Sequence, residues 1–225
     1  MEIKPIAYIR TDFKEKFGIP RQSTIANKLT AKIVFTPEFR NPDALRGIEG
    51  FSHLWLIFDF SLAHREKWSP MVRPPRLGGN ERRGVFATRS PFRPNPLGLS
   101  SVKLVNIEQT EKDGTVLIVT GADLLDNTPI LDIKPYLAFT DSHPDATGGF
   151  TEEINKAPLE VNFPMQFLEK IEESKREGLT DILAEDPRPS YQSDAERIYS
   201  MHFDKHDIHF KIDGTLLTVV DVTDK

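Results

Sequence analysis

Short β-prone runs separated by turn residues constrain the fold more than any other feature of this sequence. Residues 54–60 form a continuous apolar and aromatic run that is too short for a typical helix, which predicts a buried strand that includes Trp55. Further candidate strands are residues 3–9, 31–35, 84–87, 102–107 and 116–119. The one candidate helix among them, residues 42–45, is too short to cover a sheet. This pattern predicts a mainly β domain, a barrel or a sandwich rather than a doubly wound sheet.

The last third of the chain has a different pattern. Residues 165–176 carry apolar positions at helical spacing, with Gly178 where a helix would be capped and Thr180 where a second short turn would begin. Asp213-Gly214 separates two β-prone runs, and this dipeptide favours a tight hairpin. We therefore expect a main domain at 1–145, a connection at 146–162, and a small α+β domain with one hairpin at 163–225.

One basic stretch stands out in an acidic chain. Residues 73–100 contain six arginines, five prolines and four glycines against a single acid, whereas the whole chain has a net charge of −5. Arginine presents a rigid fork of donors that suits phosphate and carboxylate, and proline-rich backbone holds such groups in place. The stretch predicts a binding loop for an anionic partner such as RNA. The alternative is an ordinary charged surface loop.

Several classes of chemistry lack their sequence signals. The chain has no cysteine, which excludes disulfides, thiol catalysis and thiolate metal sites. It contains neither of the glycine-rich nucleotide-binding motifs nor the motifs of zinc proteases and serine hydrolases. We expect no metal site, and we expect His202, His206 and His209 to be surface residues. No signal peptide or membrane-length apolar run is found, so a cytoplasmic protein is expected.

Methyl transfer from a sulfonium donor remains compatible with the lack of catalytic motifs. It is an in-line displacement that depends on alignment and on exclusion of water more than on a catalytic acid.

Five segments carry a recognisable combination of motifs. They are FGIPRQ from Phe17, FSHLW from Phe51, the arginine-rich stretch through ATRSPFRPNP from Ala87, DNTP from Asp126 with DIKPY from Asp132, and ILAEDPRP from Ile182. Taken together, these segments closely resemble the TrmO family (TsaA-like, formerly YaeB), and the resemblance spans about residues 3 to 220.

The resemblance implies a fold, an activity and a partner. It implies a single-sheeted β-barrel with a small C-terminal domain, working as a homodimer. The implied reaction uses S-adenosylmethionine to methylate N6 of threonylcarbamoyl-adenosine at tRNA position 37, the base 3′ of the anticodon. The donor is expected near the subunit interface.

The resemblance also implies site residues. The expected donor contacts are Gln22, Ser23, Thr24, Phe60, Ser61, Arg89, Leu99, Leu124, Leu125, Asp126 and Asn127. The candidate catalytic residues are Asp126 and Tyr136, although each also has a structural interpretation, as a turn cap and as a packing residue. The candidate tRNA contacts are Arg76, Arg82, Arg83, Arg93, Lys134 and Arg188.

Two positions depart from the family pattern. Ser23-Thr24-Ile25 follows Gln22 where the family has Pro-Gly-Leu or similar, and Asn127 replaces a glycine. Asparagine tolerates left-handed backbone better than other non-glycine residues, so the turn survives. Two alternative functions stay open, a non-catalytic RNA-binding module and a protein-interaction module whose arginines meet an acidic partner.

Overall fold

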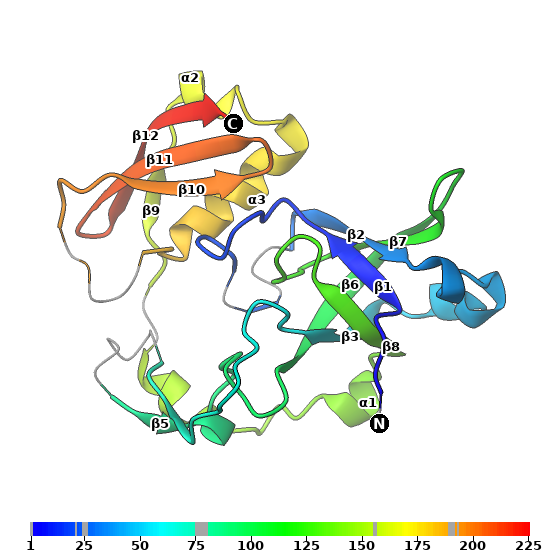
Figure 1. The fold of residues 1–225 in the computed structure, drawn as a ribbon. Coiled ribbons are helices and arrows are strands. Elements are labelled where there is room, and N and C mark those ends of the chain that lie inside the picture. The colour runs from blue at the N-terminus through cyan, green and yellow to red at the C-terminus, as the bar shows by residue number, and fades with distance from the viewer. Residues whose placement is uncertain are drawn as a thin grey trace.

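The fold is described from a computed structural model (Figure 1). It covers residues 2–20, 22–23, 27–74, 81–154, 157–188, 192 and 194–225. Thr24 and Arg76 lie outside these ranges, so the predictions for them are not addressed by the structure.

Six antiparallel strands form the main sheet, in the order β1-β2-β7-β6-β3-β8, and β8 pairs with β1 so that the sheet closes into a barrel. The strands are β1 (Ala7–Arg10), β2 (Thr30–Phe35), β3 (His53–Asp59), β6 (Leu97–Thr110), β7 (Gly114–Thr120) and β8 (Pro129–Pro135). The prediction of a mainly β chain with few helices is confirmed.

Alternation of side chains along β3 builds the barrel core. Leu54, Leu56 and Phe58 are buried, whereas the residues between them are half-buried on the outer face. Trp55 was expected in the core, but it faces outward, where its Nε1 donates to Asp141 Oδ2 at 2.9 Å. A continuous apolar run therefore does not mean burial on both faces in this antiparallel sheet.

The connections carry short elements. Between β2 and β3 lie the 3-10 turns η1 (Pro37–Phe39), η2 (Pro42–Leu45) and η3 (Ile48–Gly50), and beyond β8 lie α1 (Ala138–Asp141) and η6 (Gly149–Ile154). The arm between β3 and β6 contains β4 (Met71–Val72) paired with β5 (Arg83–Gly84), followed by η5 (Val85–Ala87). Residues 84–87 were predicted as a strand, but all except Gly84 form the 3-10 turn η5.

The C-terminal part forms a second sheet of order β10-β11-β12-β9, with two helices (Figure 1). Its elements are β9 (Glu160–Asn162), α2 (Met165–Leu168), α3 (Glu173–Ala184), β10 (Tyr199–Phe203), β11 (His206–Asp213) and β12 (Leu216–Asp224). The hairpin prediction is confirmed, with Gly214 at φ 57° between β11 and β12. The end of the expected connection instead forms β9, which pairs in parallel with β12.

The helix predictions were wrong in detail. The expected single helix over residues 165–176 is divided into α2 and α3. Gly178, expected as a cap, lies buried inside α3, and Thr180 Oγ1 donates to the Arg176 carbonyl within the same helix at 2.9 Å. The reason is tertiary: a Cβ on Gly178 would lie 2.6 Å from Leu29 Cγ, so glycine is needed there for close packing rather than for a turn.

The N-terminal segment between β1 and β2 joins the two parts of the chain. Phe13 and Leu29 are buried in the core of the C-terminal sheet, beside α3. Lys175 Nζ of α3 contacts Asp12 Oδ1 at 2.8 Å and Asp204 Oδ2 at 2.9 Å. The segment that leads into Gln22 is therefore fixed by the C-terminal part and not by the barrel alone.

Candidate functional site

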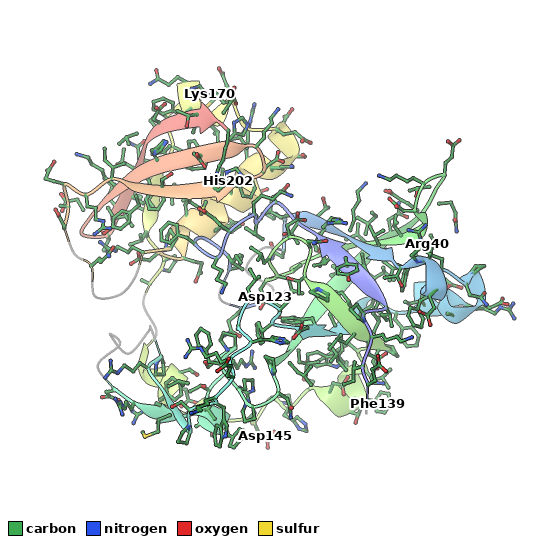
Figure 2. All side chains as sticks on the ribbon, viewed as in Figure 1. Arg40, Asp123, Phe139, Asp145, Lys170 and His202 are labelled. Atoms are coloured by element: carbon green, nitrogen blue, oxygen red, sulfur yellow. The ribbon has the colours of Figure 1, made fainter. Side chains whose placement is uncertain are left out.

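A cleft of about 1730 Å³ opens where the carboxyl end of β3, the β4–β5 arm, the β7–β8 connection and η6 meet. It is larger than the cavities that typically hold one small ligand, so it has room for a cofactor and part of a larger substrate. Figure 2 labels Asp123, which lies at the end of the barrel that faces both the arm and the C-terminal sheet.

Gln22 and Arg89 form the central contact of this cleft. Arg89 Nη1 donates to Gln22 Oε1 at 2.6 Å, although the two residues lie 67 positions apart in the sequence. Both line the cleft. The structure thus brings together two of the predicted donor residues, one from the FGIPRQ segment and one from the arginine-rich stretch.

Asp123 supplies a carboxylate beside this pair, and the sequence analysis missed it. It accepts a hydrogen bond from Ser100 Oγ at 2.6 Å and lines the cleft. Burial raises the pKa of Asp123, and this rise is opposed by the Ser100 hydroxyl, the positive charge of Arg89 and the backbone N–H of Ser23. A signal was present, because Asp123 is an acid between apolar residues directly before the predicted Leu124 segment.

Four other predicted donor residues also line the cleft, namely Phe60, Ser61, Leu124 and Leu125. Phe60 is fixed by its backbone N–H, which donates to the Pro96 carbonyl at 2.8 Å, and by edge-on packing against Phe58. Leu124 is almost fully buried, and its carbonyl accepts from Thr11 Oγ1 at 3.1 Å. These residues give the cleft an apolar wall next to the charged Arg89 and Asp123.

Four described donor candidates do not line the cleft: Ser23, Leu99, Asp126 and Asn127. Ser23 is nevertheless close, because its backbone N–H donates to Asp123. Leu99 lies on the outer face of β6 and is 57% exposed. Asp126 accepts from the Thr11 backbone N–H and pairs with Lys14 Nζ, both at 2.9 Å. Asn127 has φ 64°, the left-handed conformation expected of it, and Arg10 donates to its Oδ1 at 2.6 Å. Asp126 and Asn127 therefore hold the β1 end against the β7–β8 connection.

Tyr136, the second catalytic candidate, lies at the other end of β3. Its ring packs against Trp55 at 5.3 Å and against His53 at 6.2 Å between ring centroids, and its backbone N–H donates to the His53 carbonyl. It does not line the cleft. In a single chain these contacts are those of a packing residue.

Among the candidate tRNA contacts, Arg82 and Arg93 line the cleft, and Arg82 is exposed. Arg93 Nη1 donates to the Thr88 and Ser90 carbonyls, so this side chain braces its own loop. Arg83 pairs with Glu81 at 2.6 Å.

The other two described candidates lie outside the cleft. Lys134 pairs with Asp132 at 3.0 Å, and Arg188 Nε donates to Asp186, also at 3.0 Å. The arginines that were expected to form one basic surface therefore have different roles. Arg82 lines the cleft and is exposed, whereas Arg93 holds its own loop in place.

The histidine prediction was wrong for two of three residues. His202 and His206 are buried, and their Nδ1 atoms lie 2.9 Å from Asp207 and 3.0 Å from Asp224. Within the described residues no group of three or more histidine, cysteine or carboxylate side chains is arranged to hold a metal ion. In the same part of the chain no helix is long and apolar enough to cross a membrane.

Asp123 provides a pH test of the cleft. Because burial raises its pKa, the folded protein retains this proton to higher pH than the unfolded chain does, and the stability contributed by Asp123 falls as pH rises above about 4. We expect Asp123→Asn to gain stability relative to the unchanged protein as the pH rises above about 4. Melting temperatures of both proteins across this range measure the difference; a difference that does not vary with pH would contradict the burial of a charged Asp123.

The fold and the cleft define a class of protein. It is a mainly β protein whose cofactor-sized cleft contains a half-buried carboxylate and an arginine, and its sequence lacks a nucleotide-binding glycine loop. Comparison with known proteins agrees with the expected family. Residues 8–142 match the tRNA-methyltransferase O N-terminal domain, and residues 156–225 match the TrmO C-terminal domain. The chain therefore belongs to the TrmO family, as the sequence resemblance predicted.

Individual relatives cover nearly the whole chain. It is 41% identical to the Escherichia coli tRNA (adenine(37)-N6)-methyltransferase over 201 residues, 87% of this chain and 85% of that one. It is 39% identical over 229 residues to a putative S-adenosylmethionine-dependent methyltransferase RcsF of Pseudomonas aeruginosa, covering 98% and 96%. A crystal structure of TrmO from Pseudomonas aeruginosa superposes with a TM-score of 0.79 at 34% identity, covering 99% and 98%.

Proposed function

We propose that this protein is an S-adenosylmethionine-dependent tRNA methyltransferase that methylates N6 of the adenosine at position 37. The observation that carries the proposal is the meeting of Gln22, Arg89 and Asp123 in one cleft, in a chain that matches both TrmO domains. We further propose that the substrate nucleoside carries a threonylcarbamoyl group, as the family resemblance implies.

The residues of the cleft fit the chemistry of this donor. S-adenosylmethionine combines an amino-acid carboxylate and ammonium, a sulfonium, a ribose and an adenine, and when bound it supplies the activated methyl group. Arg89 offers a guanidinium to a carboxylate, and Asp123 offers an acceptor to an ammonium or hydroxyl group. Phe60, Leu124 and Leu125 provide an apolar wall that excludes water from the reacting atoms.

In this mechanism the chain aligns its reactants rather than attacking them. Arg89 and Gln22 fix the donor end of the cleft, and Ser100 holds the Asp123 carboxylate in place. Asp126 and Tyr136 support this arrangement from outside the cleft, through the β1 end and the outer barrel face. Their proposed role is positioning.

We also propose that the protein is a homodimer. Leu97, Leu99 and Val105 all project from the outer face of β6 and are 41%, 57% and 52% exposed. Exposed apolar side chains on one strand suit a symmetric contact with a second copy. This arrangement would also let Leu99 reach the donor site of the other subunit, in line with the contact that the family resemblance implies.

The remaining proposals concern organisation and location. We infer that residues 1–145 form the barrel domain that binds the donor and that residues 163–225 form the smaller C-terminal domain. Residues 146–162 connect the two domains, and the last of them form β9, which pairs with the sheet of the smaller domain. We propose that the protein acts in the cytoplasm, because a tRNA substrate is available there.

Calorimetric titration tests the donor site. S-adenosylmethionine and its demethylated product should each bind with one site per chain. A protein that binds tRNA but gives no heat with either nucleoside would favour the non-catalytic RNA-binding alternative.

The tRNA contact of Arg82 has a separate test. Replacing Arg82 by glutamine should reduce the slope of log affinity against log salt for tRNA by about 0.7 to 0.9, because one phosphate contact is lost. Arg46→Gln is the matched control, since Arg46 is also highly exposed but does not line the cleft. Filter binding across a salt series gives both slopes, and equal slopes in the two variants would remove Arg82 from the RNA surface.

A further inference from the structure

Two aromatic rings lie face to face on the arm beside the donor residues. Trp68 precedes β4 and Phe86 lies in η5, and their ring centroids are 6.2 Å apart with 29° between the ring planes. Both line the cleft, yet Trp68 is 52% and Phe86 is 73% exposed. A stacked pair of this kind is normally buried, because each ring removes a large apolar area from water.

Two further apolar side chains extend this surface. Leu62 and Met71 are also well exposed and also line the cleft. Together with Trp68 and Phe86 they form what we call the arm platform. An exposed apolar patch inside a cleft marks a binding surface rather than a random feature of the exterior.

The charges around the arm platform indicate the kind of partner. The described side chains lining the cleft include six cations and only three acids. They are Lys16, Arg65, Arg73, Arg82, Arg89 and Arg93 against Asp59, Glu66 and Asp123. Flat apolar rings among cations suit unpaired nucleobases on a phosphate backbone, since stacking accepts any base and the cations accept the phosphates.

A second copy of the chain fits this surface less well. Two identical basic clefts would bring like charges together, at a cost in free energy. The exposed side chains of Leu97 and Leu99 on β6 offer an uncharged candidate contact for a second copy.

We propose that the arm platform binds an unpaired nucleobase of the RNA substrate by stacking on Trp68 and Phe86, next to the donor site. This inference rests on the proposed function, and it names residues that select a single-stranded loop over a duplex. The platform would position the RNA so that the reacting base reaches the donor.

Tryptophan fluorescence gives a direct readout, because the chain contains two tryptophans and Trp55 lies on the barrel, away from the cleft. In a Trp55→Phe protein, Trp68 is the only tryptophan. A hairpin RNA with the sequence of an anticodon stem and loop should quench its fluorescence in a saturable manner. A fully paired RNA of equal length should quench it much less.

Matched variants separate stacking from general damage. Trp68→Ala and Phe86→Ala should each weaken binding of the hairpin RNA by about 5- to 150-fold, the range expected for loss of one stacked base. Trp68→Phe should retain most of the affinity, because it keeps a ring. Phe139→Ala is the control: Phe139 is 88% exposed, lies on α1 apart from Asp123 (Figure 2), and does not line the cleft. The Phe139→Ala protein should bind the hairpin RNA with unchanged affinity.

The outcomes are distinguishable. Equal quenching by loop and duplex RNA, or unchanged affinity in both alanine variants, would overturn the platform while leaving donor binding and methylation intact. A contact between two copies of the chain would give a different pair of results. Trp68 fluorescence would change with protein concentration in the absence of RNA, and the Trp68→Ala protein would sediment as a monomer. Both results together would overturn the RNA-binding platform. Failure of the proposed function itself would show as absent donor binding by the unchanged protein.

Discussion

Replacing Arg89 by alanine is expected to lower the affinity for S-adenosylmethionine by about 10- to 150-fold, which corresponds to loss of a charged hydrogen bond worth roughly 1.5–3 kcal/mol. The variant also frees Gln22 from its 2.6 Å contact and removes a positive charge near Asp123. Both changes loosen the donor end of the cleft. Methyl transfer should therefore fall by at least the same factor.

Two further variants define the role of Arg89. Arg89→Lys retains the charge but not the fork of donors, so an intermediate affinity is expected. Arg46→Ala removes an exposed arginine outside the cleft and should leave donor binding unchanged. Calorimetry measures all three. Wild-type affinity in a folded Arg89→Ala protein would exclude Arg89 from the donor site.

Replacing Gly18 by alanine is expected to destabilise the fold next to the site. Gly18 has φ 87°, and a Cβ there would lie 2.0 Å from Met201 Sδ and 2.4 Å from Met201 Cγ. Overpacking costs about 1–3 kcal/mol and left-handed backbone about 1–2 kcal/mol more. The unfolding free energy should fall by about 2–5 kcal/mol. Because Gly18 is four residues before Gln22, donor affinity should fall as well.

Gly47 provides the matched control for this prediction. It has the same φ of 87°, but nothing lies within 4 Å of its Cβ position. Gly47→Ala should therefore show only the backbone cost, about 1–2 kcal/mol, and normal donor binding. Urea denaturation of both variants separates the two contributions. Equal destabilisation would show that Met201 does not press on this loop and that the C-terminal part does not support it.

Much of the fold could be predicted because its signals are local. Residues 54–60 and the Asp213-Gly214 turn each indicate their structure within a few positions. The role of Gly178 was predicted wrongly because its close packing depends on Leu29, which lies far away in the sequence. His202 and His206 were expected at the surface because nothing local shows that a hairpin end will be covered.

In the site, too, features with a sequence motif could be predicted, whereas features that depend on long-range contacts could not. The resemblance identified Gln22 and Arg89, and the structure places them in contact. Asp123 was missed although it stands as an acid between apolar residues, because its hydrogen-bond partners Ser100 and Ser23 lie far away in the sequence. Trp68 and Phe86 lie 18 positions apart and become a pair only when the arm folds back on itself.

The most direct test of the account is methyl transfer to tRNA. The protein is incubated with S-adenosylmethionine carrying an isotope-labelled methyl group and with tRNA that carries or lacks the threonylcarbamoyl group on adenosine 37, and the nucleosides are then analysed by mass spectrometry. We predict one labelled methyl group on N6 of the threonylcarbamoyl-adenosine at position 37, and its loss in Arg89→Ala. Absence of transfer from a protein that binds both donor and tRNA, or a label at any other position, would contradict the assignment.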